Sequence, residues 1–253
     1  MTKIIAVSNQ KGGVAKTTTC LSLGAALAET GQSVLLVDLD PQANLTLSMG
    51  FQPEKLHRAV GDALLGNVSL LSVSRESTVF ELDLVPANPR LALIDKLLYG
   101  QTNYEFRLKN RLKTIDKTLY NYVLIDCPPS FSTLTLNAFT AANLLLIPVQ
   151  CEYYAAHALK QTTGLAKLVQ QKTNPALTYK VLVTMYDRRN KISRIVFEQL
   201  QNDLRHLLLD TRIEIDTKLR ESPAFSQPIT VYAPKTRGAQ QYRTLAQELI
   251  NYG

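Results

Sequence analysis

The chain has 253 residues, a formal net charge of +7 and 45% hydrophobic residues, a balance typical of a folded protein with a sizeable core. It contains no apolar run approaching 18 residues and no leader-like segment, which argues against a membrane-spanning or secreted protein. Its three cysteines are widely spaced and its three histidines are scattered, which argues against a disulfide framework and against a metal cluster. A cytoplasmic location is expected.

Short apolar runs alternate with helical patterns along the chain. Strand-like runs lie at 3–7, 33–40, 79–87, 120–129, 143–150 and 179–187, and helical patterns follow Thr17 and cover 104–119, 132–142, 153–172, 191–208 and 238–251. Such alternation predicts a mostly parallel sheet with helices on both faces. No linker, repeat or low-complexity tract interrupts it, so a single doubly wound α/β domain over residues 1–253 is predicted.

The segment VSNQKGGVAKTTTCL, residues 7–21, has the composition of a phosphate-binding loop. A strand, a glycine-bearing loop and a helix together aim backbone N–H groups at an anion. Lys16 would reach the β- and γ-phosphates, and the Thr17 hydroxyl would ligate Mg²⁺. An ordinary βα turn with incidental lysines is the alternative. We predict a nucleoside triphosphate site formed by Lys11, Gly12, Gly13, Val14, Ala15, Lys16, Thr17 and Thr18.

The loop departs from the common G-x-x-x-x-G-K-[ST] pattern, because Gln10 stands where the first glycine would be. It fits K-G-G-x-x-K-[ST], and on this motif the chain resembles the ParA/MinD ATPases, most closely the small Soj-like partition ATPases. The resemblance implies ATP and Mg²⁺, and a homodimer in the ATP state in which Lys11 reaches the partner subunit's phosphates. Most close relatives have glycine where Ala15 stands, and the methyl group of alanine restricts φ in this loop.

Two predicted strands end in aspartates. Asp38 and Asp40 lie in SVLLVDLDPQ, and Asp126 follows four apolar residues in YVLIDCPP. Ligands of open α/β sheets collect at the carboxyl ends of strands, so these carboxylates are expected beside the phosphate loop. Asp126 matches a Walker B position, which reaches Mg²⁺ through water. The resemblance gives Asp40 the role of orienting the attacking water. Asp38 is interpreted as an outer support of the Mg²⁺ site or as a group that holds the loop.

Other site residues follow only from the resemblance. Met185 and Pro223 are placed near the adenine of ATP, since the segments around them border the base in relatives. Gln150 and Glu152 are placed near the dimer interface, although Glu152 fits a helix-capping residue equally well.

The basic excess lies in the second part of the chain. Up to residue 130 there are 13 basic and 12 acidic residues, and from 131 onward there are 15 and 9. Composition alone also fits an ordinary solvated surface, and the cations of 107–117 are interpreted in that way. In Soj-like proteins, however, two basic loops form a DNA surface without sequence preference, and phosphate contacts need only cations. The predicted DNA-binding residues are Arg188, Arg189, Lys191, Arg194, Lys218, Arg220, Lys235 and Arg237.

The resemblance implies a partition ATPase whose ATP-bound dimer binds duplex DNA and whose slow hydrolysis is stimulated by a ParB-like partner. It would be nucleoid-associated, and no N-terminal helix-turn-helix domain is expected. The main alternative is an ATPase of the same type that positions a non-DNA cargo, such as a secretion or cellulose-synthesis complex. A MinD-like membrane ATPase is disfavoured, because the segment TLAQELINYG carries one charged residue and is no basic amphipathic helix. Chromosomal and plasmid roles stay open.

Overall fold

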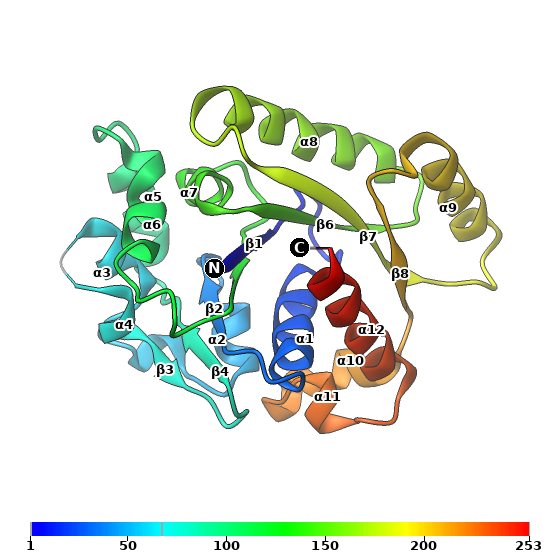
Figure 1. Ribbon diagram of the computed structural model, residues 1–253, viewed down its shortest axis with the longest axis horizontal. Helices are drawn as coiled ribbons and strands as arrows, with labels where there is room; N and C mark the ends of the chain where they lie inside the picture. The colour runs from blue at the N-terminus through cyan, green and yellow to red at the C-terminus, as the bar shows by residue number, and fades with distance from the viewer. Residues whose placement is uncertain (1, 67, 253) are drawn as a thin grey trace.

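One sheet organises the molecule (Figure 1). The computed structural model describes residues 2–66 and 68–252, and within these ranges eight strands pair in the order β3-β4-β2-β5-β1-β6-β7-β8. All pairs are parallel except the antiparallel pair β3–β4 at one edge. The predicted mostly parallel α/β sheet is therefore confirmed. The strands are β1 (Lys3–Val7), β2 (Val34–Asp38), β3 (Arg75–Glu76), β4 (Leu82–Val85), β5 (Tyr122–Asp126), β6 (Leu144–Gln150), β7 (Thr178–Tyr186) and β8 (Leu208–Glu214).

Helices connect the strands and cover both faces of the sheet. Between β1 and β6 lie α1 (Lys16–Ala28), α2 (Asn44–Ser48), α3 (Val60–Leu65), α4 (Leu70–Val73), α5 (Leu91–Leu98), α6 (Arg107–Leu112) and α7 (Thr133–Ala141). The second half contributes α8 (Ala155–Lys172), α9 (Lys191–Leu204), α10 (Thr217–Glu221), α11 (Ile229–Tyr232) and α12 (Arg237–Asn251). Short 3₁₀ turns lie at η1 (Pro53–Lys55), η2 (Tyr104–Phe106) and η3 (Ser222–Phe225).

The two faces of the sheet form two hydrophobic cores. Neighbouring residues of a strand point to opposite faces, so Leu35 and Val37 enter the core under α3, α5, α7 and α8, whereas Val34 and Leu36 enter the core under α1 and α12. All four are fully buried. This burial on both faces explains why the strands read as continuous apolar runs rather than as an alternating pattern. Figure 1 shows α1 and α12 side by side on one face and α8 over the other.

Three sequence predictions about elements need correction. The single helix predicted over 104–119 is wrong, because η2 and α6 end by Leu112 and the Asp116 carboxylate accepts the Thr118 N–H in a local turn that competes with helix. The helix predicted over 191–208 ends at Leu204, and β8, which was not predicted, begins at Leu208. The sequence also did not indicate the short helices α3, α4 and α5. By contrast, α7, α8 and α12 lie within two residues of their predicted bounds.

Strand order determines where the site lies. The chain leaves β1 for β2 on one side of the sheet and later returns to place β6 on the other side of β1. The carboxyl end of β1 is therefore a point at which the strand order reverses, and such points form ligand crevices in open α/β sheets. Val7, Asp38 and Asp126 are aligned there across β1, β5 and β2.

Candidate nucleotide site and basic surface

The phosphate loop joins β1 to α1 through two residues with left-handed backbone. Gly13 has φ +74, where glycine carries no penalty, and Ala15, the residue before α1, has φ 64 and ψ 34. A non-glycine residue in this region costs about 1–2 kcal/mol. The methyl group of Ala15 has therefore not shifted the loop out of the left-handed conformation. It has left a strained residue there instead.

The loop is fixed by polar contacts to two different strands. Asn9, which is 1% exposed, accepts the Lys11 N–H and donates to the Pro148 carbonyl at the end of β6. Thr184, in β7, donates to the carbonyl of Val14 over 3.0 Å. These contacts hold the backbone in place before any ligand binds, which lowers the entropic cost of binding an anion.

Lys16 lies inside the site. Its side chain is buried and its Nζ donates to the Lys11 carbonyl over 3.3 Å. Burial lowers the pKa of Lys16, while the nearby carboxylates of Asp126 and Asp40 act in the opposite direction. A buried ammonium group with few hydrogen-bond acceptors is well suited to bind a phosphate, because the phosphate oxygens would replace the lost hydration.

The two strand-end aspartates Asp38 and Asp126 have different partners. Asp38 accepts the backbone N–H of Asp40 and both the N–H and the hydroxyl of Thr46. Burial raises its pKa to about 6, and these hydrogen bonds oppose the shift. These hydrogen bonds hold the segment after β2. Of the two interpretations given to Asp38, the loop-holding one accounts for these contacts.

Asp126 fits the Mg²⁺ role at the level of single atoms. Its Oδ2 accepts the Thr17 hydroxyl over 2.7 Å, while its Oδ1 is buried without a hydrogen-bond partner. Burial raises the pKa of Asp126 well above its usual range, and the adjacent Asp38 carboxylate adds to the effect. An unpartnered buried carboxylate oxygen is costly unless a water or an ion satisfies it. In the described ranges no group of three or more His, Cys, Asp or Glu side chains could hold a metal by itself, so Mg²⁺ here would need phosphate and water ligands.

Asp40 lies where the loop after β2 faces the phosphate loop. It is 6% exposed, its Oδ1 accepts the Gln42 N–H over 2.9 Å, and its own N–H is held by Asp38. The carboxylate therefore has a fixed position, and its Oδ2 accepts no hydrogen bond from residues 2–66 or 68–252. It also contributes to the wall of the cavity.

Eight of the ten predicted nucleotide residues line one open cavity of about 770 Å³, large enough for a nucleoside triphosphate, whereas Lys11 and Val14 do not line it. Gly12, Gly13, Ala15, Lys16, Thr17, Thr18 and Asp40 form one part of its wall. Met185 and Pro223, the two predicted base contacts, lie in the wall with Ile213 and Leu219. Met185 has φ 52, and the β7–β8 register shifts between Val183 and Tyr186, so a bulge directs this residue towards the cavity.

Lys11 does not point into its own phosphate site. Its ammonium group forms an ion pair with the Glu152 carboxylate. The N-terminus of α8 has no side-chain cap, so the helix-capping interpretation of Glu152 is wrong. The side chains of Lys11 and Glu152 are 29% and 47% exposed, which leaves the pair accessible from outside.

The predicted DNA-binding cations come from three segments near the carboxyl ends of the strands. Arg188 and Arg189 follow β7, Lys218 and Arg220 lie in α10, and Arg237 begins α12. The Asp216 carboxylate joins two of these segments, since Oδ1 accepts the Lys218 N–H and Oδ2 accepts the Gly238 N–H. All eight predicted cations are exposed.

Half of these cations are already paired with carboxylates. Lys218 bonds Glu221 over 2.7 Å, Arg189 bonds Asp187 over 3.4 Å, and Arg188 and Arg237 both contact Glu214. Arg243, which lies near this basic segment in sequence, is held by Glu29 through two hydrogen bonds. Within residues 2–66 and 68–252, ion pairs are not found for Lys191, Arg194, Lys235 and Arg220.

Comparison with known proteins agrees with this geometry. The model of a family described as "AAA domain" matches residues 2–181. The chain is 42% identical over 254 residues to the sporulation initiation inhibitor protein Soj of Bacillus subtilis, covering all of both chains. It belongs to the ParA/MinD superfamily, among the Soj-like members.

Two further comparisons support this family. The chromosome partitioning protein ParA of Myxococcus xanthus is 39% identical, with 98% of this chain and 88% of that protein covered. A crystal structure of cobyrinic acid a,c-diamide synthase from Mycobacterium smegmatis, with bound ATP analog and magnesium, superposes with a TM-score of 0.88. It is 39% identical and covers 100% of this chain and 96% of that chain.

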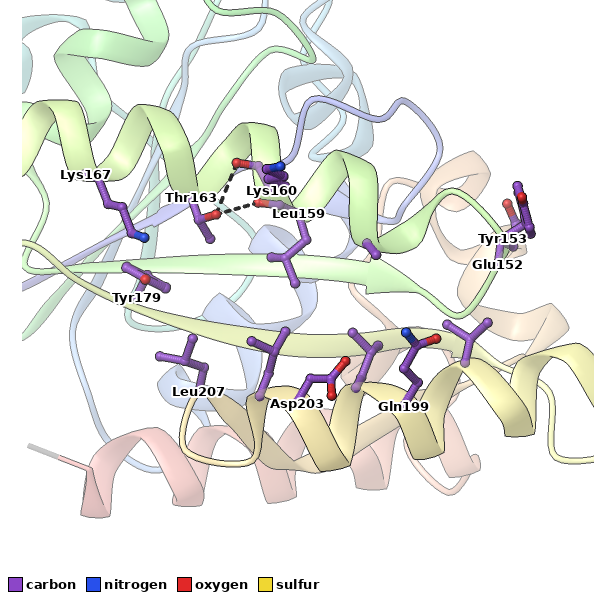
Figure 2. A pocket seen from close by; sticks show the side chains of 14 residues that line it. Glu152, Tyr153, Leu159, Lys160, Thr163, Lys167, Tyr179, Gln199, Asp203 and Leu207 are labelled. Carbon is purple, nitrogen blue, oxygen red and sulfur yellow. Dashed lines mark hydrogen bonds between the residues drawn. The ribbon is translucent and has the colours of Figure 1, made fainter.

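A second cleft, of about 310 Å³, lies between α8 and α9 (Figure 2). Its floor is mostly aliphatic and includes Leu159, Leu200 and Leu207. Figure 2 shows Glu152 and Tyr153 at one end and Lys167 and Tyr179 at the other. The cleft therefore ends at Glu152, the residue that pairs with Lys11.

Several residues of the site gave no signal in the sequence. Asn9, Thr46 and Thr184 hold the loops by hydrogen bonds that cross between strands, and nothing in their local sequence indicates these partners. Glu214 was also not singled out, although it lies in the cavity wall and contacts two arginines. Its position after an alternating run would have been informative if β8 had been predicted.

Proposed function

We propose that this chain is a Mg²⁺-dependent ATPase of chromosome or plasmid partition, which dimerises with ATP and then binds duplex DNA without sequence preference. The main observation is the phosphate loop with two lysines in different positions, Lys16 buried inside the site and Lys11 directed outwards. The relative named as chromosome partitioning protein ParA supports the biological role. We also propose that residues 1–253 act as one ATPase domain in the cytoplasm and associate with the nucleoid.

The catalytic roles follow from the positions of the side chains. The backbone N–H groups of the loop and the Lys16 ammonium would bind phosphate oxygens. The Thr17 hydroxyl and, through water, Asp126 would hold Mg²⁺, which neutralises charge on the phosphates when bound. Asp40 would orient the attacking water. With one carboxylate for this task, hydrolysis is expected to be slow until a ParB-like partner stimulates it.

The test of Asp40 separates binding from hydrolysis. Asp40→Ala should bind ATP as wild type does and hydrolyse it about 100-fold more slowly, since a small misplacement of a reactant can cost about 10²-fold in rate. ATP affinity and phosphate release are the measurements. Asn44→Ala, in the wall of the same cavity, is the control and should retain most activity. Wild-type turnover in Asp40→Ala would remove the role given to Asp40.

Dimerisation would use the outward lysine. Lys11 would leave Glu152 and reach the phosphates bound by the partner subunit. There it would stabilise negative charge that the partner's own residues leave unneutralised. A Cβ built at Gly12 meets no atom within 4 Å in the chain, so an approaching partner or ligand would explain the glycine. Lys11→Ala should bind ATP but remain monomeric in light scattering, whereas Glu152→Gln should dimerise at least as well as wild type. Nucleotide-independent dimerisation of wild type would exclude the switch.

DNA binding would be the output of dimerisation. One subunit offers too few unpaired cations for tight binding at physiological salt, because each phosphate contact adds only about 0.9 to the log–log salt dependence. A dimer presents two such surfaces and gains effective concentration. We expect duplex binding with ATP that weakens steeply as salt rises and that does not depend on sequence.

Charge reversal tests this output directly. Arg189→Glu, or the pair Lys218→Glu and Arg220→Glu, should abolish DNA binding while ATP-driven dimerisation survives, as measured by fluorescence anisotropy and light scattering. Lys167→Glu, at the far end of the α8–α9 cleft, is the control and should leave DNA binding nearly unchanged. Retained affinity in the reversals would place the DNA surface elsewhere.

An ATPase of the same type that positions a non-DNA cargo is the second candidate. It would share the ATP-dependent dimer but would bind duplex DNA no better with ATP than without it. The anisotropy measurement with and without ATP therefore discriminates between the two candidates.

In the described part of the chain, none of the helices is long and apolar enough to cross a membrane.

A further inference from the structure

Glu214 brings together two arginines from distant parts of the chain. Its Oε2 lies 3.7 Å from Arg188 Nε and also accepts a hydrogen bond from Arg237 Nη1. The side chain of Glu214 is only 19% exposed, while those of Arg188 and Arg237 are 67% and 49% exposed. One partly buried carboxylate thus holds two outward guanidinium groups.

The position of Glu214 is fixed by its backbone. Its N–H donates to Gln241 Oε1 of α12 over 2.9 Å, and the next residue, Ile215, donates to the Tyr186 carbonyl at the end of β7. The carboxylate is therefore held between the loop after β7, which carries Arg188, and the start of α12, which carries Arg237. It cannot follow either arginine far towards solvent.

This arrangement changes the charge that the surface presents. Arg188, Arg237 and Glu214 together carry a net charge of +1, whereas the two arginines alone would carry +2. A cation that is already paired with a carboxylate must exchange this partner for a phosphate, so its contribution to polyanion affinity is reduced. Lys191 and Arg194, on the neighbouring α9, have no such competitor among the ion pairs of residues 2–66 and 68–252.

We propose that Glu214 is an internal competitor of the phosphodiester backbone, which masks Arg188 and Arg237 and thereby limits polyanion binding by the single subunit. The proposal rests on the proposed DNA-binding function and adds a regulatory residue to it. Glu214 also lies in the wall of the nucleotide cavity, so the same residue borders both sites. The opposite role is that Glu214 positions the arginines for binding, and the two roles predict effects of opposite sign.

The test uses Glu214→Gln, which keeps the size of the side chain and one acceptor oxygen. Without nucleotide, where binding by single subunits is measured, this variant should bind a 24-base-pair duplex about tenfold more tightly than wild type near 0.1 M salt. The slope of log affinity against log salt should steepen by about 1 to 2, because each unmasked arginine adds about 0.9. Heparin serves as a second polyanion that is unrelated to partition, and the variant should elute from it at higher salt.

Two matched variants make the result specific. Glu76→Gln has the same change of charge but lies on β3, at the opposite edge of the sheet from β8, and should behave as wild type. In a background of Arg188→Ala and Arg237→Ala, adding Glu214→Gln should have no further effect. Thermal unfolding of each variant checks that the fold is retained. Glu214→Ala removes both acceptor oxygens and is measured in the same way, in case the glutamine introduced by Glu214→Gln still holds the arginines.

The outcomes separate this inference from the proposed function. Unchanged or weaker polyanion binding by Glu214→Gln and Glu214→Ala overturns the masking role, even if wild type binds DNA with ATP as proposed. If wild type binds no DNA in any nucleotide state, the proposed function fails. A heparin gain that disappears in the double-arginine background would support masking even then.

Discussion

The phosphate loop and the basic surface both lie at the carboxyl ends of the strands and differ in how they hold charge. In the loop, Lys16 and Asp126 are 8% and 0% exposed and their neighbours are fixed by buried hydrogen bonds. On the basic surface, the side chains of Arg188 and Arg189 are 67% and 88% exposed, and their partners are partly buried carboxylates. Buried charges are little screened by salt, whereas exposed charges are strongly screened.

This difference predicts how the two regions respond to substitution. Water cannot take over the interactions of a buried charged group. One substitution in the loop should therefore abolish nucleotide binding or hydrolysis. Exposed cations act additively when they do not share a partner, so truncating one of them to alanine should give a graded effect, smaller than that of a charge reversal. The following experiments test this contrast, beginning with the largest expected effect.

Removing the buried lysine should have the largest effect. Lys16→Ala should lower nucleotide affinity by more than 100-fold, because the phosphates lose a charge-assisted hydrogen bond in a site shielded from water. Titration with a fluorescent ATP analogue is the measurement. Lys235→Ala, an exposed lysine of the basic surface, should change that affinity less than twofold. Comparable losses in both variants would break the contrast between the regions.

Asp126→Asn should separate Mg²⁺ binding from stability. The affinity of the ATP complex for Mg²⁺ should fall about 10- to 100-fold. Because the folded-state pKa of Asp126 is raised, the wild type loses stability as pH rises from the unfolded pKa through the folded one. Asparagine removes this loss, so the variant without Mg²⁺ should unfold about 2–4 °C higher at neutral pH, for about 1 kcal/mol.

That gain in stability should shrink in acid, where Asp126 is protonated in the folded state and increasingly protonated in the unfolded state. Calorimetry at pH 7.5 and near pH 4 checks the trend. A variant that is less stable than wild type at both pH values would show that Asp126 is not destabilising in the absence of the ion.

Single cations of the basic surface should have smaller and unequal effects. Lys191→Ala or Arg194→Ala should weaken duplex binding in the ATP state a few-fold and reduce the salt slope by about 1. Arg188→Ala should do less, since Glu214 already offsets its charge. Anisotropy across a salt series measures both quantities. Equal losses at Arg188 and Arg194 would show that pairing with Glu214 does not matter.

The smallest effect is expected at Ala15. Ala15→Gly should raise stability by about 0.5–1 kcal/mol, because glycine relieves the left-handed strain, partly offset by its greater freedom in the unfolded chain. Ala28→Gly, at the last residue of α1 and with helical backbone, should instead lower stability by about 1 kcal/mol. Denaturant unfolding of both variants gives the comparison, and a loss of stability in Ala15→Gly would contradict the strain.

The sequence predicted much of the fold where the pattern was buried on both faces. Central strands read as apolar runs, and α7, α8 and α12 were predicted within two residues. It failed at β8, an edge strand with one buried face, where Leu207 to Leu209 continue the apolar pattern of α9. Periodicity alone does not distinguish a helix end from such a strand start.

By itself the sequence determined the phosphate loop, because backbone N–H groups, Lys16 and Thr17 lie within a few consecutive residues and need only a strand and a helix on either side. Strand-end aspartates were predictable for the same reason, since parallel strands end at one edge. Only the tertiary structure decided which partner each charge has. Lys11 with Glu152, and Glu214 with Arg188 and Arg237, are pairs between segments far apart in sequence. Their distances depend on strand order and loop packing, which no local pattern of residues specifies.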